Sequence, residues 1–233
     1  QSGIGTDASF IQAILVGLKN LVFTILAIAF IDKLGRKPLL TFGVAGIVIC
    51  MSILAYGFST AKYSLSNEAI QTLSANLETS QLNSISGQVF GNDVEYKTAL
   101  EGALGKDVVA ANESELIKAA ISMNPTLILI GILGFVASFA ISLGPVMWVL
   151  FSELFPNRIR GIAISFVGLI NSAVSFIVQW IFPWELATFG SATTFLIYGI
   201  FAAIGLIFII KVIPETKGKS LEELEAILVT TKS

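Results

Sequence analysis

The sequence predicts an all-α membrane protein. Hydrophobic residues make up 55% of its 233 residues and charged residues only 13%, whereas soluble domains carry about 25% charged residues. The mean hydropathy is +0.84. Apolar residues gather in runs near the ~20 residues that a helix needs to cross ~30 Å of hydrocarbon. These runs lack alternation at period two, so we expect helices rather than barrel strands.

We expect five runs to span the bilayer: residues 9–31, 38–60, 126–151, 162–184 and 192–212. The third run contains Gly144-Pro145, where we expect the helix to break because proline lacks a backbone N–H. Trp148 follows three residues after the break.

The distribution of lysine and arginine predicts the orientation of these spans. Positive residues gather in segments 32–38 and 152–161 and in the tail from residue 214, whereas residues 1–8 and 183–191 carry none. By the positive-inside rule, the first three segments are cytoplasmic. We therefore expect a multi-pass protein of the cell membrane (the inner membrane in a Gram-negative bacterium), with residues 61–124 extracytoplasmic.

Residues 61–124 form a polar insertion between the second and third spans, with eight acids and four lysines. Helical spacing predicts short helices and loops here, with Asn67 and Asn112 as N-caps. We interpret this insertion as a solvated spacer without an activity of its own, because surface loops tolerate insertions at small cost.

Composition also limits the function. The chain has no histidine and one cysteine, Cys50, which argues against a structural zinc site or a Ser-His-Asp triad. We expect no enzyme activity, metal or cofactor, and the net charge of −2 argues against a nucleic-acid partner. Because the chain begins with Gln1 rather than methionine, we expect a fragment.

Polar residues inside the spans are candidate ligand contacts. Asn20 and Thr24 share one helix face, and Asn171 and Ser175 share another. Such residues either join helices by hydrogen bonds worth ~0.6 kcal/mol each or line a cavity. Lys19 at mid-span costs ~2.5–3.5 kcal/mol on insertion scales, so it either faces a water-filled cavity or snorkels.

Trp148 lies beside the predicted break, where an aromatic face could stack on a sugar. Packing within the bundle is the alternative role for this residue.

Acid–base clusters recur at the predicted cytoplasmic helix ends: Asp32 with Arg36 and Lys37, Glu153 with Arg160, and Glu215 with Lys217. They are either solvent-exposed charges that only set the membrane orientation or breakable salt bridges of a gate. An exposed pair contributes only ~0–1 kcal/mol, so a gate requires a network.

Three motifs resemble the sugar porter family of the major facilitator superfamily. They are D-K-L-G-R-K-P at 32–38, G-P-V-M-W-V-L-F-S-E-L-F-P-N-R-I-R-G at 144–161 and P-E-T-K-G-K-S-L-E-E-L-E at 214–225. Within the family, the chain is most similar to D-xylose–proton symporters and facilitative glucose transporters. The resemblance implies that the five spans are helices 8 to 12 of twelve, and that the partner is the missing N-terminal half of the same transporter.

The resemblance also implies the function and the site. It predicts alternating-access transport of a monosaccharide, with Asn20, Trp148 and Asn171 binding the sugar. Possible cavity residues are Lys19, Thr24, Gly144 and Ser175, and the cytoplasmic gate comprises Asp32, Arg36, Glu153, Arg160 and Glu215. We expect proton-coupled symport, with a facilitative uniporter or a non-transporting sugar sensor as alternatives. The five spans contain no carboxylate at mid-depth, so a proton relay would lie in the missing half.

Overall fold

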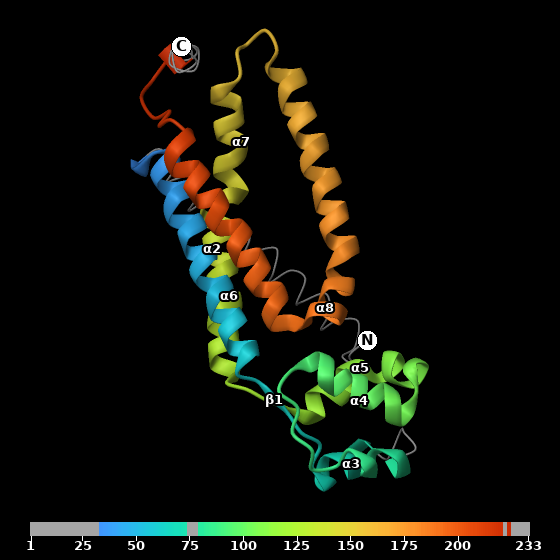
Figure 1. Ribbon diagram of the computed structural model, residues 1–233. Helices are drawn as coiled ribbons and strands as arrows, with labels where there is room; N and C mark the ends of the chain where they lie inside the picture. Colours follow the sequence, from blue (N-terminus) through green and yellow to red (C-terminus); the bar gives the residue numbers. More distant parts are fainter. Residues whose placement is uncertain (1–32, 74–78, 221–222, 225–233) are drawn as a thin grey trace, which may run out of the picture. The chain divides into compact units, whose positions relative to one another are not determined.

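The computed structural model describes residues 33–73, 79–220 and 223–224, which are mostly helical as predicted. The helices are α2 (Arg36–Ser59), α3 (Asn67–Leu73), the 3-10 helix η1 (Thr79–Ser84), α4 (Asp93–Leu104), α5 (Lys106–Ala120), α6 (Pro125–Ile141), α7 (Leu143–Leu154) and α8 (Arg160–Val212) (Figure 1). Two short strands, β1 (Lys62–Tyr63) and β2 (Ile121–Ser122), pair antiparallel.

Three helical stretches of the described chain are long and apolar enough to cross a membrane: Arg36–Ser59, Pro125–Leu154 and Arg160–Val212. The first of these, α2, matches the predicted span 38–60. The predicted span 9–31 lies outside the described residues.

Helix α8 comprises two of the predicted spans. Its 53 residues would extend ~80 Å at 1.5 Å per residue, more than twice the thickness of the hydrocarbon core. Gly190 interrupts the helix with φ 78° and ψ 165°, a backbone conformation that glycine adopts without a steric penalty. The chain reverses direction at this turn (Figure 1), which separates the two arms as the sequence predicts.

The break in the third span falls at Ser142, which has φ −114° and ψ −89°, and not at Gly144-Pro145. Pro145 cannot donate to the Ile141 carbonyl four residues earlier, and its ring clashes with that carbonyl. The distortion therefore appears before the proline, which lies in the first turn of α7. The Ser142 side chain donates to the Ser138 carbonyl at 2.6 Å, a bond within the helical stretch rather than between spans.

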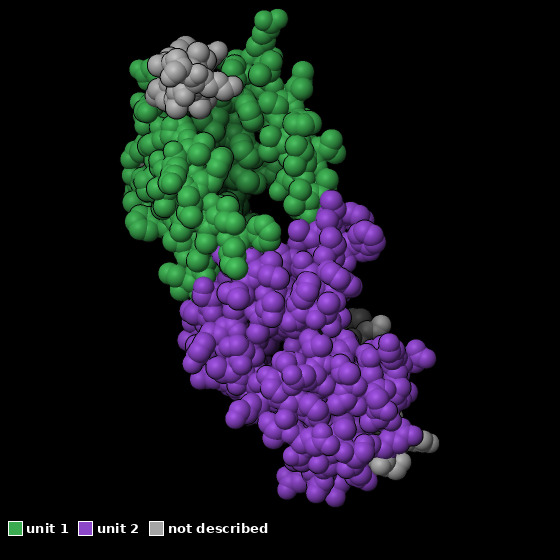
Figure 2. All heavy atoms as spheres, viewed as in Figure 1, with its two compact units in different colours: residues 1–49, 133–175, 200–233 green, residues 50–132, 176–199 purple. Residues whose placement is uncertain are grey.

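The chain divides into two compact units, residues 1–49, 133–175 and 200–233 in one and residues 50–132 and 176–199 in the other (Figure 2). In the first unit, α2 packs tightly on α6. A Cβ at Gly43 or Gly46 would overlap Ser142 or Ser138 respectively. Small residues of this kind let helix backbones approach each other in a membrane. A buried apolar core joins α2, α7 and the end of α8: Leu39, Leu40, Val44, Val146, Leu150 and Ile209.

The second unit contains the insertion, which has a core of its own. Tyr63, Leu82, Tyr96, Leu100 and Leu116 are all at most 2% exposed. This core orders α3, α4 and α5 against one another, and these are short helices of the kind predicted for the insertion.

The predicted helix caps in the insertion were wrong. Ser66, not Asn67, caps α3 by accepting from the Ala69 amide at 3.1 Å. Asn112 lies at a kink inside α5, with φ −123° and ψ 15°.

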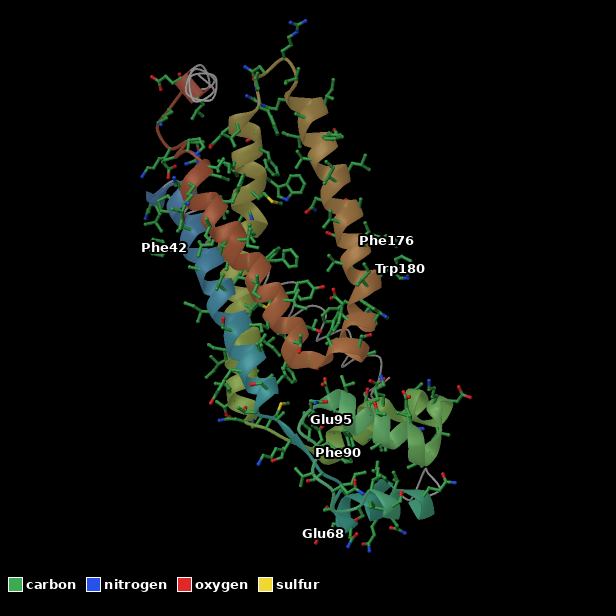
Figure 3. The ribbon with its side chains drawn as sticks, viewed as in Figure 1. Phe42, Glu68, Phe90, Glu95, Phe176 and Trp180 are labelled. Atoms are coloured by element: carbon green, nitrogen blue, oxygen red, sulfur yellow. The ribbon has the colours of Figure 1, made fainter. Side chains whose placement is uncertain are left out.

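Large apolar side chains cover the outer helix surfaces. Phe42 on α2 is 76% exposed, and Phe176 and Trp180 on α8 are 68% and 74% exposed. They project outward from their helices (Figure 3). Because water would be a poor solvent for so much exposed apolar surface, these faces fit a lipid environment.

Candidate functional site

Trp148 lies on α7 against the first arm of α8. Its ring meets Phe151 edge-on, with centroids 6.1 Å apart and planes at 86°. A Cβ at Gly168 would lie 3.8 Å from Cη2 of Trp148. This distance is ordinary contact, so the indole lies against the α8 backbone at Gly168, and the Trp148 side chain remains 43% exposed. One edge of the indole is therefore packed while the rest stays accessible.

Asn171 and Ser175 lie on the same face of α8 as Gly168. Spacings of three and seven residues place side chains in one stripe along a helix, and both residues are exposed in this chain. The structure therefore brings Trp148 within one helical turn of the stripe that carries Asn171. An aromatic ring beside an amide can hold a small polyhydroxylated molecule, by stacking on its C–H face and hydrogen bonding to its hydroxyl groups.

Gly144 lies in the first turn of α7, just after the break. A Cβ there would be 3.5 Å from the Phe139 carbonyl oxygen, which is ordinary contact with α6. The described contacts of Gly144 are thus with the chain on the other side of the break. Of the other predicted site residues, Lys19, Asn20, Thr24 and Asp32 lie outside the described residues, and their roles stay predictions.

The predicted gate residues Arg36, Glu153 and Glu215 meet in one place, together with Thr216, and we call these four residues the Arg36 cluster. Arg36 donates to Glu153 Oε1 from Nε at 3.1 Å and from Nη2 at 2.8 Å. Thr216 Oγ1 donates to the other carboxylate oxygen of Glu153 at 2.6 Å. The cluster joins the start of α2, the end of α7 and the segment after α8.

Glu215 caps the beginning of α2. Its Oε1 accepts from the Arg36 amide at 3.0 Å and its Oε2 from the Lys37 amide at 3.1 Å. A carboxylate at a helix N-terminus satisfies unpaired amides and interacts favourably with the helix dipole. Gly35 permits this arrangement, because it has φ 92° and a Cβ there would lie 2.7 Å from Glu215 Oε2.

Arg160 does not pair with Glu153. Its Nε instead donates to the Phe155 carbonyl at 3.2 Å, and its Nη2 is buried without a hydrogen-bond partner. Sequence proximity suggested a pair between Glu153 and Arg160, but the structure pairs Glu153 with Arg36, 117 positions away. Sequence reasoning also missed Thr216 and Gly35, although both lie inside the quoted motifs P-E-T-K-G and D-K-L-G-R-K-P.

Among the residues that the structure describes, no group of three histidine, cysteine or acidic side chains is placed to hold a metal ion. The contacts described in this region are hydrogen bonds, aromatic contacts and an ion pair.

Comparisons with known proteins agree with this chemistry. The family described as "Sugar (and other) transporter" matches residues 1–75 and 103–228. The D-xylose-proton symporter of Escherichia coli K12 is 33% identical over 231 residues, which cover 97% of this chain and 35% of that protein. The glucose transport protein of Synechocystis sp. is 31% identical over 222 residues, which cover 95% of this chain and 37% of that protein.

A solved structure is similar over nearly the whole chain. It is the proton:xylose symporter XylE of the major facilitator superfamily, bound to 6-bromo-6-deoxy-D-glucose, with a TM-score of 0.60 and 32% identity over 97% of this chain and 36% of that one. The chain thus spans about a third of the length of these relatives. The family match leaves out residues 76–102, which contain η1 and most of α4.

Proposed function

We propose that this chain, which belongs to the sugar transporter family of the major facilitator superfamily, forms part of a membrane protein that moves a monosaccharide by alternating access. The observation that carries the proposal is the position of Trp148, half-exposed and one helical turn from Asn171 on α8. An indole face and an amide at one place suit a neutral sugar better than an ion or an apolar solute.

The sugar would bind between this bundle and the rest of the transporter. Asn171 and, from the span outside the described residues, Asn20 would each contribute hydrogen bonds worth about 0.5–1.5 kcal/mol. Trp148 would stack on the apolar face of the ring. A few bonds of this size give an affinity loose enough for release, as a transport cycle requires. Lys19, Thr24, Gly144 and Ser175 would border the same cavity.

The Arg36 cluster would act as the cytoplasmic gate. Its contacts join three chain segments through a partly buried carboxylate, so a conformational change that separates the segments must break several charged hydrogen bonds together. Asp32 and Arg160 would complete this network. The buried Nη2 of Arg160, which has no hydrogen-bond partner here, would donate to an acceptor in another state of the cycle.

The proposed membrane placement follows the positive-inside rule. Segments 32–38 and 152–161 and the tail from residue 214 would face the cytoplasm. The insertion would lie outside the cell membrane, and the rest of the transporter would complete the bundle.

Proton-coupled symport is the proposed mode of transport, supported by the 33% identical relative, a D-xylose-proton symporter. Facilitative uniport is the alternative. The two are separated by measuring sugar uptake into vesicles with and without a protonophore. A symporter accumulates sugar above the external concentration and loses that accumulation when the gradient collapses, whereas a uniporter only equilibrates.

The site is tested by uptake of radiolabelled D-xylose and D-glucose with the full-length protein. Loss of the Trp148 stacking surface is worth about 0.5–1.5 kcal/mol beyond area burial, so Trp148→Ala should raise KM about twofold to twelvefold. Asn171→Ala should raise KM by a similar factor, because it removes a hydrogen bond worth about 0.5–1.5 kcal/mol. Trp180→Ala is the matched control, because that indole projects outward from α8 (Figure 3). Unchanged KM in both site variants would contradict the assignment, and sugar binding without any uptake would favour the sensor.

A further inference from the structure

The insertion is attached firmly to two membrane helices. Strands β1 and β2 pair Lys62 with Ser122 and Tyr63 with Ile121, directly after α2 and directly before α6. The flanking residues Ala61 and Ala120 are buried in the insertion core. The described end of α2 and the start of α6 are therefore held together by the folded insertion itself.

Asp93 in the first turn of α4 reaches a third membrane segment. Its Oδ2 accepts from the Ser191 amide at 2.8 Å and from the Ser191 hydroxyl at 2.6 Å. Ser191 is the first residue after the break at Gly190, so Asp93 caps the last span (191–212) where it begins. A Cβ at Gly190 would lie 2.5 Å from Asp93 Oδ1, so glycine is also required for this close approach.

Asp93 is not needed to cap its own helix. Asn92 performs that function, because its Oδ1 accepts from the Glu95 amide at 2.8 Å. Glu95, the other acid of the same turn, folds back to the Gly91 amide at 3.3 Å. Of these first-turn acids, Asp93 is the one whose carboxylate contacts the turn of α8.

Neighbouring contacts support the same junction. Phe58 near the end of α2 stacks on Phe195 of the last span, with centroids 5.4 Å apart and planes at 9°. On the other side, Lys97 of α4 pairs with Glu113 of α5 at 2.8 Å, beside a groove lined by Asp93, Pro183, Leu186 and Ser191. The beginning of the last span is thus held by α2 on one side and by α4 on the other.

We propose that Asp93 is a positioning residue that acts through Ser191. It fixes the start of the last span to the insertion, so that the insertion-side ends of α2, α6 and the last span move as one body and stay joined throughout the transport cycle. The effect of the Asp93–Ser191 contact on the rate of transport rests on the proposed transport function. Asp93 lies within residues 76–102, which the family match leaves out. The residue that caps the last span therefore comes from the inserted segment.

The first test is hydrogen–deuterium exchange on the full-length protein. Asp93→Ala and Ser191→Ala should each raise exchange of the amides of residues 191–195 at least tenfold, while Tyr96 and Leu100 in the insertion core stay protected. Glu95→Ala is the matched control from the same helical turn and should leave residues 191–195 unchanged. In the double variant Asp93→Ala/Ser191→Ala, these amides should exchange no faster than in the single variant with the larger effect. Unchanged exchange in both single variants would overturn the proposal even if the protein moved no sugar.

The second test asks whether the contact persists during transport. Cysteines replace Asp93 and Ser191 in a full-length variant whose other cysteines, Cys50 included, have been replaced, and a short bis-methanethiosulfonate reagent joins them. Cross-linked protein should keep at least half of the uptake rate of the uncross-linked variant. Asp93→Ala should lower Vmax about fivefold with KM changed less than twofold. A tenfold loss on cross-linking, restored by a reductant, would show that the contact must open and would overturn the proposal.

Discussion

Glu153 offers the sharpest test of the Arg36 cluster. Its carboxylate accepts from Nε and Nη2 of Arg36 and from the Thr216 hydroxyl. Glu153→Gln keeps the size and one carbonyl acceptor but removes the negative charge. The change therefore weakens the charged hydrogen bonds at one point without creating a cavity, and it affects three chain segments at once.

The magnitude follows from burial. Hydrogen bonds to charged groups contribute about 1.5–3 kcal/mol, whereas exposed ion pairs contribute about 0–1 kcal/mol. The two side chains are 14% and 22% exposed, so water screens the pair only partly. We expect a coupling of about 1.5–2 kcal/mol between Arg36 and Glu153, which corresponds to roughly a tenfold to thirtyfold change in an equilibrium constant.

A double-mutant cycle measures this coupling. The full-length protein is prepared as Glu153→Gln, Arg36→Gln and the double variant, and unfolding free energy in detergent is measured alongside sugar uptake. The cycle isolates the pair from the other contacts of each residue. Glu223→Gln is the control, because that tail carboxylate accepts from the Ser220 amide, away from the cluster. A coupling below about 0.5 kcal/mol, the usual limit of additivity, would refute the reasoning, and normal uptake in Glu153→Gln would refute the gate.

Three further predictions concern stability. Gly35→Ala should lower the unfolding free energy by at least about 1 kcal/mol in a denaturant titration, because a positive φ disfavours L-residues and the new Cβ would crowd Glu215. Tyr96→Phe should cost about 0.5–1.5 kcal/mol in the same assay, because it removes the buried 3.0 Å hydrogen bond that the Tyr96 hydroxyl donates to the Leu116 carbonyl. Burial, with the charge of Asp93, raises the pKa of Tyr63 from 10.0 to about 12. The unfolded chain therefore loses this proton first, and stability should fall between about pH 10 and 12, a fall that Tyr63→Phe should reduce.

Local rules predicted the membrane helices of the described residues well. The predicted span 38–60 agrees with α2 (Arg36–Ser59) to within two residues at its start, because apolar run length and charged ends determine where a helix can cross a membrane. The break between the last two spans, at Gly190, falls within residues 185–191, which the predicted spans 162–184 and 192–212 leave between them, although the helix continues beyond the predicted end at residue 184. The helix break was predicted at Gly144-Pro145, but it lies two residues earlier, at Ser142. The reason is that a proline disturbs the carbonyl four residues before it.

The ion pair between Arg36 and Glu153 could not be predicted from the spacing of charged residues along the sequence. Glu153 and Arg160 would share a helix face only if the helix continued between them, but α7 ends at Leu154 and Phe155 has an extended backbone. Arg36 reaches Glu153 instead because the core of α2, α7 and α8 brings their ends together. Likewise, the polar composition of the insertion concealed a core whose members, such as Tyr63 and Leu116, are separated by more than fifty positions.

The sequence by itself determined the membrane class, the approximate positions of the described spans and the residue types present at the helix ends. These depend on transfer of side chains into lipid and on backbone hydrogen bonding, both of which are local properties. Only the tertiary structure decided which charges pair, that Trp148 lies beside the Asn171 stripe, and that Asp93 caps the last span. Those depend on close packing between segments distant in the chain, where a contact forms only once many other side chains have fixed the backbones around it.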